Sequence, residues 1–373
     1  MYTFELFHRN ESGNDSGGLQ SKAVASGWLS ISFRQCTTIH ELQGIQVQRF
    51  ITKILDCFFL LRFPLLAPVW TIFILGWICG NDALLPGGRF RIPPDRMVWH
   101  DLWFVLTGFS LMVASIYVVN QIVDIEGDRI NRKLFLLPHG FLSLRTAWIL
   151  AGVCVSAGFL IALQYDLVMS GIFAVSLLLG IAYNLPPFSL KNHAFGGVFA
   201  NALGHGALTF IAGWYTVRYP GGLTTDTAIT GLIAAIAPAL ANGAVFLATT
   251  IPDAQGDLLT GKRTFCVKYG PRVTSRISAI VCAGACMGSF FMGPHSWVMI
   301  FPSFISLFFF IILAVSDRQE RAFRAFKWPV FLLSASVALF VPVYGLLILV
   351  TFFGSKLYYK WRFGIDYPTF KSK

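Results

Sequence analysis

The chain has 373 residues, of which 55% are hydrophobic and only 13% are charged, and its mean hydropathy is +0.64. Soluble domains usually carry about 25% charged residues, so this composition excludes an ordinary soluble domain and indicates an integral membrane protein. The formal net charge of +11 comes from basic residues in loops between apolar runs, which fits membrane topology and an anionic ligand and predicts no nucleic-acid partner.

The N-terminal stretch, residues 1–56, is polar and lacks the continuous apolar core of a secretory signal. We predict that it is an extension of the membrane domain, with an interfacial helix near residues 41–56. The predicted transmembrane domain covers residues 57–353, and a basic tail covers residues 354–373.

Apolar runs then recur along the chain, each near the roughly 20 residues that a helix needs to cross a bilayer. We predict an all-α integral membrane protein in which about nine transmembrane helices form one bundle around a central cavity. The runs lie at residues 58–79, 102–120, 146–164, 167–185, 198–217, 229–251, 277–293, 297–315 and 329–353.

Nine crossings would place the two ends of the chain on opposite sides of the membrane. In that assignment 19 of the 29 Lys and Arg residues fall on the side of the N-terminus, which predicts that this side is cytoplasmic. The basic tail, with Lys356, Lys360 and Arg362, falls on the other side and opposes the assignment.

Two acidic segments follow the second and the sixth of these runs, so both lie on the predicted cytoplasmic side. Asn120, Asp124 and Asp128 recur every four residues in the first segment, and Asp253 and Asp257 repeat the spacing in the second. Residues four apart share one face of a helix, where like charges repel. One such pair of carboxylates could simply be exposed to water at the end of a helix, but two pairs on the same side are harder to explain in this way. Mg²⁺ takes oxygen ligands and commonly combines one or two carboxylates with substrate phosphates, so the pattern predicts a magnesium site that binds a diphosphate.

Basic residues close to both acidic segments, on the same predicted side, are candidates to contact diphosphate oxygens. Arginine would bind them in bidentate fashion, and lysine would act as a point charge. These candidates are Arg129, Arg132, Lys133, Lys191, Lys262, Arg263 and Lys268.

The two segments resemble the Asn-x-x-x-Asp-x-x-x-Asp and Asp-x-x-x-Asp motifs of the UbiA superfamily of intramembrane prenyltransferases. The stretches 120–131 and 251–257 are most similar to the homogentisate-prenyltransferase branch. Tyr183-Asn-Leu-Pro-Pro187, followed by Lys191, is similar to the segment after the fourth helix of the family. The resemblance covers roughly residues 58–353.

This resemblance implies a UbiA-like helical bundle in the lipid bilayer that binds Mg²⁺ and ionises an isoprenyl diphosphate. Asp124, Asp128, Asp253 and Asp257 would be the catalytic metal ligands, with Asn120 as a further ligand. The residues implied at the diphosphate are Asn120, Arg129, Arg132, Lys191, Lys262 and Tyr183.

Three functions stay open at this point. The first is transfer of the prenyl group to an aromatic or other lipophilic acceptor. The second is cyclisation without an acceptor, as in UbiA-type terpene cyclases, because residues 131–140 depart from the transferase pattern. The third is cation transport, since membrane carboxylates also line ion pathways. His139 and His205 are candidates for a base that removes a proton from an acceptor or a cation.

Overall fold

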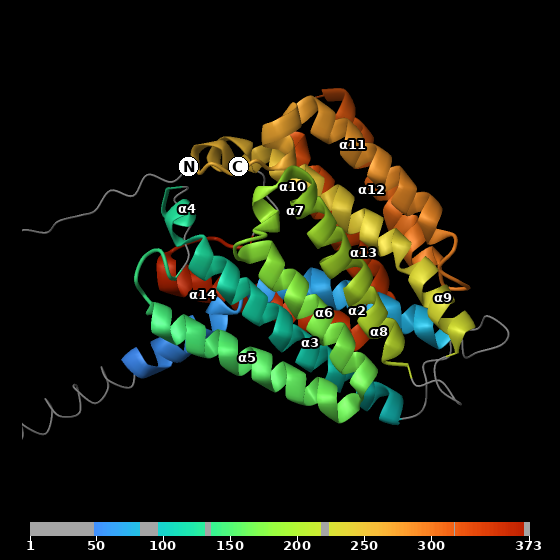
Figure 1. Cartoon of the computed structure of the whole chain (residues 1–373), viewed down its shortest axis with the longest axis horizontal. Helices are drawn as coiled ribbons and strands as arrows, with labels where there is room; N and C mark the ends of the chain where they lie inside the picture. The colour runs from blue at the N-terminus through green and yellow to red at the C-terminus, as the bar shows by residue number, and fades with distance from the viewer. Residues whose placement is uncertain (1–47, 83–95, 131–135, 218–223, 317, 369–373) are drawn as a thin grey trace, which may run out of the picture.

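The structure is a computed structural model that describes residues 48–82, 96–130, 136–217, 224–316 and 318–368. Within these ranges the regular structure is helical, and an isolated parallel bridge joins His193 to Arg263. Figure 1 shows long helices packed side by side into one bundle. After a helix at residues 48–60, the elements are α2 (Phe63–Asp82), α3 (Arg96–Val123), α4 (Ile125–Ile130), α5 (Leu144–Tyr165), α6 (Leu167–Asn184), η1 (Leu190–Asn192), α7 (Ala194–Asn201), η2 (Ala202–Leu208), α8 (Thr209–Tyr215), α9 (Thr225–Ala234), α10 (Ile236–Leu259), α11 (Phe265–Ser289), α12 (Trp297–Ser316), α13 (Gln319–Phe340) and α14 (Pro342–Phe363).

Nine segments of the described chain are long and apolar enough to cross a membrane. One of them joins α7, η2 and α8, and another joins α9 and α10. The remaining seven are α2, α3, α5, α6, α12, α13 and α14. The prediction of an all-α membrane protein with about nine spanning helices is therefore confirmed.

Helix α11 is as long as these segments but less apolar, because its first half carries Lys268, Arg272 and Arg276. It runs antiparallel along α10. A Cβ on Gly288, near its end, would lie 3.4 Å from the Cα of Ala237 at the start of α10. Helix α11 therefore covers the same length of the bundle as α10.

The predicted ninth run, residues 329–353, is wrong as a single helix. The structure divides it into α13 and α14 at Val341, and Pro342 begins α14. Proline has no backbone N–H and breaks a continuing helix, but it is well tolerated in the first turn of a new one. Hydropathy alone does not register this break, because the residues on both sides are apolar.

Because the predicted ninth run forms two helices, α13 and α14, and α11 corresponds to the predicted seventh run, the chain crosses the bundle once more than predicted. This additional crossing reverses the predicted placement of the chain ends. The end of α14 returns to Asp56, just before α2, where Arg362 Nε lies 3.1 Å from Asp56 Oδ1. The prediction that the two ends lie on opposite sides is therefore wrong for the described chain. The basic residues at the end of α14 join the side of the acidic segments. The predicted division at residues 56 and 353 stays a prediction, although α14 continues through Phe363.

Close backbone contact fixes the crossing of α2 and α8. A Cβ on Gly213 would lie 1.8 Å from the carbonyl oxygen of Phe73, and a Cβ on Gly76 would lie 2.1 Å from that of Phe210. Small residues permit such approach in membranes, where helices associate largely through van der Waals packing. This crossing holds the α7–η2–α8 segment against the first spanning helix.

The antiparallel connections bring several helix ends to one end of the bundle. Helices α3, α6 and α10 finish there, whereas α7 and α11 begin there. Both acidic segments therefore lie at the same end, although more than a hundred residues separate them in the sequence.

Candidate active site

Asp124 lies at the break between α3 and α4. The backbone N–H of Asp124 donates to Asn120 O (3.0 Å), and that of Asp128 donates to Asp124 O (2.7 Å). These bonds preserve the helical four-residue spacing across the break. The carboxylates of Asp124 and Asp128 nevertheless have different partners. Asp124 contacts two lysines, whereas Asp128 lies near Arg62.

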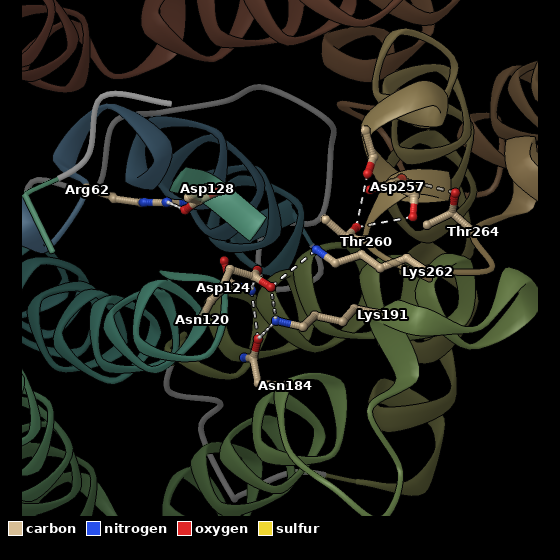
Figure 2. Close-up of polar contacts among 11 residues, drawn as sticks. Arg62, Asn120, Asp124, Asp128, Asn184, Lys191, Asp257, Thr260, Lys262 and Thr264 are labelled. Carbon is tan, nitrogen blue, oxygen red and sulfur yellow. Dashed lines mark hydrogen bonds and ion pairs between the residues drawn. The ribbon is translucent and has the colours of Figure 1, made fainter. Parts of the chain in front are cut away.

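The Asp124 carboxylate joins three parts of the chain. Its Oδ1 lies 2.9 Å from Lys191 Nζ and 3.2 Å from Lys262 Nζ, and its Oδ2 accepts a hydrogen bond from Asn120 Nδ2 (3.1 Å). Figure 2 shows both lysine side chains reaching the same carboxylate. The Lys191 side chain is only 6% exposed, compared with 24% for Lys262. We call Asn120, Asp124, Lys191 and Lys262 the Asp124 cluster.

Asn184, the last residue of α6, forms hydrogen bonds with two members of this cluster. Its Oδ1 accepts from Asn120 Nδ2 (2.7 Å) and from Lys191 Nζ (3.4 Å), and its Nδ2 donates to Gly180 O (3.0 Å). In the sequence, Asn184 follows Tyr183 at the end of an apolar run, a position that suits either the headgroup site or an anchor at the membrane interface. The structure brings it to Asn120 and Lys191.

Two local structures place the lysines. Helix α10 ends at Leu259 with Thr260 as its C-cap, and Gly261 adopts a positive φ of 74°. The Lys262 N–H then bonds back to Asp257 O (2.9 Å), as in a Schellman motif, which turns Lys262 toward the helix end. The Arg263 N–H donates to Asn192 O (3.0 Å), and this bond ties the η1 turn that carries Lys191 to the same loop.

Charge within the cluster keeps Asp124 ionised. Burial alone would raise the pKa of the Asp124 carboxyl, but Lys191 and Lys262 outweigh burial and lower it below its ordinary value. Burial lowers the pKa of the Lys191 ammonium, and Asp124 opposes that shift. Asp124 is therefore an anionic oxygen donor at neutral pH.

The other residues of the first segment lie beside this cluster rather than in it. Asp128 is buried, and its Oδ2 lies 3.9 Å from Nη2 of Arg62, which precedes α2. Arg129 pairs instead with Glu126 at 2.9 Å on the exposed face of α4. Arg132 lies outside the described residues.

The second segment faces the first across the same end of the bundle (Figure 2). Asp257 Oδ2 accepts a hydrogen bond from Thr264 Oγ1 (3.1 Å), which links the end of α10 to the start of α11. Asp253, one turn earlier, is exposed. Tyr183, in the last turn of α6, borders a cavity between α3 and α6.

The donor set fits magnesium. In the described part of the chain, no three His, Cys, Asp or Glu side chains form a ready metal cluster. Magnesium does not need one, because it usually retains waters and uses one or two carboxylates together with substrate phosphates. The carboxylate and amide oxygens of Asp124, Asp257 and Asn120 belong to the ligand class that this ion prefers.

Solved structures share the fold. A UbiA homologue from Archaeoglobus fulgidus, bound to GPP and Mg²⁺, superposes with a TM-score of 0.57 at 19% identity, over 79% of this chain and 99% of that one. A UbiA homologue from Aeropyrum pernix K1 gives a TM-score of 0.59 at 14% identity, over 74% of this chain and 97% of that one. At these identities the likeness shows the fold alone.

Curated sequences extend the comparison. The chain is 31% identical over 208 residues to a probable homogentisate phytyltransferase 2 from Oryza sativa subsp. japonica, a match over 53% of each chain. It is 25% identical over 201 residues to a 2-acylphloroglucinol 4-prenyltransferase from Humulus lupulus, over 51% of this chain and 47% of the relative. The matched region thus spans about half the length of these plant relatives.

A Synechocystis homogentisate phytyltransferase matches over more of its length, with 23% identity over 71% of this chain and 87% of the relative. The family model described as "UbiA prenyltransferase family" matches residues 83–335, which is more than half of the chain and includes both acidic segments. On this match, the protein belongs to the UbiA prenyltransferase family.

Proposed function

We propose that the protein is a magnesium-dependent intramembrane prenyltransferase that ionises an isoprenyl diphosphate and transfers the prenyl group to a hydroxylated aromatic acceptor. The observation that carries this proposal is the Asp124 cluster, in which one carboxylate and two lysines meet at the end of the membrane bundle. Carboxylates suit a divalent cation and lysines suit a diphosphate, so the cluster supplies both kinds of partner in one place.

In this proposal Asp124, Asp128, Asp253 and Asp257 hold Mg²⁺, and Asn120 adds an amide oxygen. When bound, the metal neutralises negative charge on the diphosphate and favours its departure. Asp124 and Asp128 lie just after α3 and in α4, Asp253 and Asp257 lie in the last two turns of α10, and Lys262 links the two regions through Asp124. In this scheme the diphosphate binds between the two acidic segments.

The two lysines of the cluster are proposed to bind the substrate in addition to Asp124. Lys191 and Lys262 contact Asp124 in the structure, and we propose that they bind the diphosphate oxygens when substrate enters. Each ammonium then stabilises charge that develops as the C–O bond breaks. Tyr183 immediately precedes Asn184, whose side chain contacts Lys191, and is proposed to contact the substrate. Arg129 and Arg132 stay proposed contacts of the diphosphate, although Arg129 pairs with Glu126 in the structure.

The substrate classes rest on the relatives. A solved relative is bound to GPP and Mg²⁺, and the curated relatives are named for the prenylation of homogentisate or acylphloroglucinols. These names support an isoprenyl diphosphate donor and a hydroxylated aromatic acceptor. The family favours transfer over the cyclase and transporter alternatives, and no feature of the described residues favours either of those.

We also propose that the acidic segments face the cytoplasm. The structure supports this because the basic end of α14 lies beside Asp56 on the same side, which removes the one group of basic residues that had opposed the assignment. An epitope tag at the C-terminus should then be accessible to antibody from the cytoplasmic face only. Access from the opposite face only would overturn the orientation.

The reaction is tested by incubating purified protein in nanodiscs with geranyl diphosphate and Mg²⁺, with or without homogentisate or a 2-acylphloroglucinol. Extracts are resolved by liquid chromatography and mass spectrometry. The proposal expects a prenylated aromatic product that appears only with acceptor. A cyclic hydrocarbon formed without acceptor would replace it with the cyclase. Vesicle flux of cations without any product would replace it with the transporter.

A further inference from the structure

A second polar feature lies inside the bundle, next to the Asp124 cluster. It is a half-open cavity lined by residues of α3, α6, α7, η2 and the first residue of α8. Tyr183, which borders it, immediately precedes Asn184, and Ile116, on its opposite wall, lies one turn before Asn120. These two residues place one part of the cavity wall close to the Asp124 cluster along α3 and α6.

Most polar groups on its wall already have partners. Ser176 Oγ donates to Ile172 O and Thr209 Oγ1 donates to Gly204 O, both at 2.8 Å. Asn201 Nδ2 donates to Gly197 O (2.9 Å), and its side chain also interacts with the Tyr183 hydroxyl. The hydrogen bonds of these residues hold the wall together.

His205 is the exception on this wall. Its ring lies 5.8 Å from that of Tyr117, and within the described chain neither ring nitrogen has a hydrogen-bond partner. The half-buried imidazole therefore has unused hydrogen-bonding capacity that a ligand in the cavity can satisfy. The imidazole therefore marks where a polar group of a ligand would bind.

The backbone at His205 is unusual as well. Residues Ala202–Leu208 form a π-helix between α7 and α8. Such widened turns are rare and occur frequently at functional sites. Behind this turn, a Cβ on Gly206 would lie 2.4 Å from the Cα of Ala239, so α10 packs tightly against the π-helix. The wall that carries His205 is thereby held in place.

The lining indicates the kind of ligand. Aromatic rings of Phe109 and Tyr183 stand with one imidazole and one amide, a combination suited to a flat ring that bears hydroxyl groups. A second cavity, between α2 and α10–α13, has a more apolar lining and offers hydrocarbon a better match.

We propose that the cavity at His205 binds the aromatic ring of the acceptor, and that His205 forms a hydrogen bond with a ring hydroxyl. This proposal rests on the proposed prenyl transfer, because it names the binding site of the second substrate of that reaction. In this proposal His205 recognises the acceptor and takes no part in diphosphate binding.

The test compares steady-state kinetics of the full chain in nanodiscs for wild type, His205→Phe, His205→Gln and the control His100→Phe. His100 is exposed at the other end of α3. Homogentisate and geranyl diphosphate are varied separately at fixed Mg²⁺. We expect His205→Phe to raise the KM for homogentisate about tenfold, as loss of a buried hydrogen bond would. The KM for geranyl diphosphate should stay within about twofold, and His205→Gln, which keeps a hydrogen-bonding group, should recover part of the loss.

Two results would overturn the proposal. An increase only in the KM for geranyl diphosphate would place the prenyl chain in this cavity. Equal kinetics for wild type and His205→Phe would remove His205 from substrate recognition. If wild type forms no prenylated product, the proposed transfer itself fails, and thermal stabilisation by homogentisate alone then decides the cavity. Stabilisation of wild type but not of His205→Phe would support it, and no difference would overturn it.

Discussion

Replacement of Lys191 by Met should destabilise the substrate-free protein more than the same replacement of Lys262. Both ammonium groups contact Asp124 Oδ1, but Lys191 is nearer, at 2.9 Å, and its side chain is 6% exposed against 24%. At an effective dielectric constant of about 20, two unit charges 2.9 Å apart attract by roughly 6 kcal/mol. The cost of desolvating both charges offsets most of this attraction.

We therefore expect Lys191→Met to lower the free energy of unfolding by about 2 kcal/mol, since Asp124 keeps Lys262 as a partner. For Lys262→Met, whose charge is closer to water, the loss should be below about 1 kcal/mol. Methionine preserves the length and apolar stem of the side chain, so packing changes little.

Thermal unfolding of protein purified in one detergent, followed by tryptophan fluorescence, measures the difference. The Tm of Lys191→Met should fall by several degrees, and that of Lys262→Met by a degree or two, as the ΔΔG values and the size of the chain suggest. Equal shifts, or a larger shift for Lys262→Met, would refute the assignment of Lys191 as the buried partner of Asp124.

Three further predictions concern stability. Asp56→Asn removes a buried carboxylate that accepts a hydrogen bond from Tyr358 Oη (2.6 Å) and pairs with Arg362. The substitution should lower the free energy of unfolding by about 3 kcal/mol and make α14 sensitive to limited proteolysis. Proteolytic resistance equal to that of wild type would contradict this. Gly213→Val should prevent folding or lower the Tm sharply, because a Cβ there meets the Phe73 carbonyl at 1.8 Å; a Tm equal to wild type would refute the close α2–α8 crossing. Because the pKa of Asp124 is lowered in the folded state, its stabilisation is present above its unfolded pKa and is lost as pH falls through the folded value. The Tm difference between wild type and Asp124→Asn should therefore shrink only in strong acid, and a difference that vanishes near neutral pH would contradict the shift.

Much of the site could be predicted because its information is local. The four-residue spacing of Asn120 and Asp124 survives the break between α3 and α4, since backbone hydrogen bonds continue across it. Lys191 and Lys262 are basic residues beside predicted helix ends, which makes them candidates, and both contact Asp124. Periodicity, charge and hydropathy were sufficient for these residues.

The remaining parts depend on contacts between distant segments. Nothing near Asp128 in the sequence indicates Arg62 as its neighbour, and nothing near Asp56 indicates Arg362. Arg129 shows the converse, because a basic residue beside the motif pairs locally with Glu126. Residue type and position define candidates, whereas the packing of the helices decides which candidates meet.

The division of residues 329–353 was missed for a different reason. A hydropathy window averages over about 20 residues, and one Pro342 among apolar neighbours hardly changes the mean. The missing N–H of proline acts on a single helical turn. The same averaging conceals the π-helix at Ala202–Leu208, whose composition is that of any membrane helix.

The central claim, that the two acidic segments hold magnesium for prenyl transfer, is tested most directly by product formation from geranyl diphosphate and homogentisate in nanodiscs. Wild type, Asp124→Asn, Asp253→Asn and the control Glu126→Gln are compared, with and without EDTA. Glu126 belongs to the first segment, but its side chain is 73% exposed and pairs with Arg129 on the outer face of α4. We expect EDTA to abolish product, both aspartate variants to lose activity at least about a hundredfold, and Glu126→Gln to match wild type. Undiminished product in either aspartate variant, or in EDTA, would contradict the account.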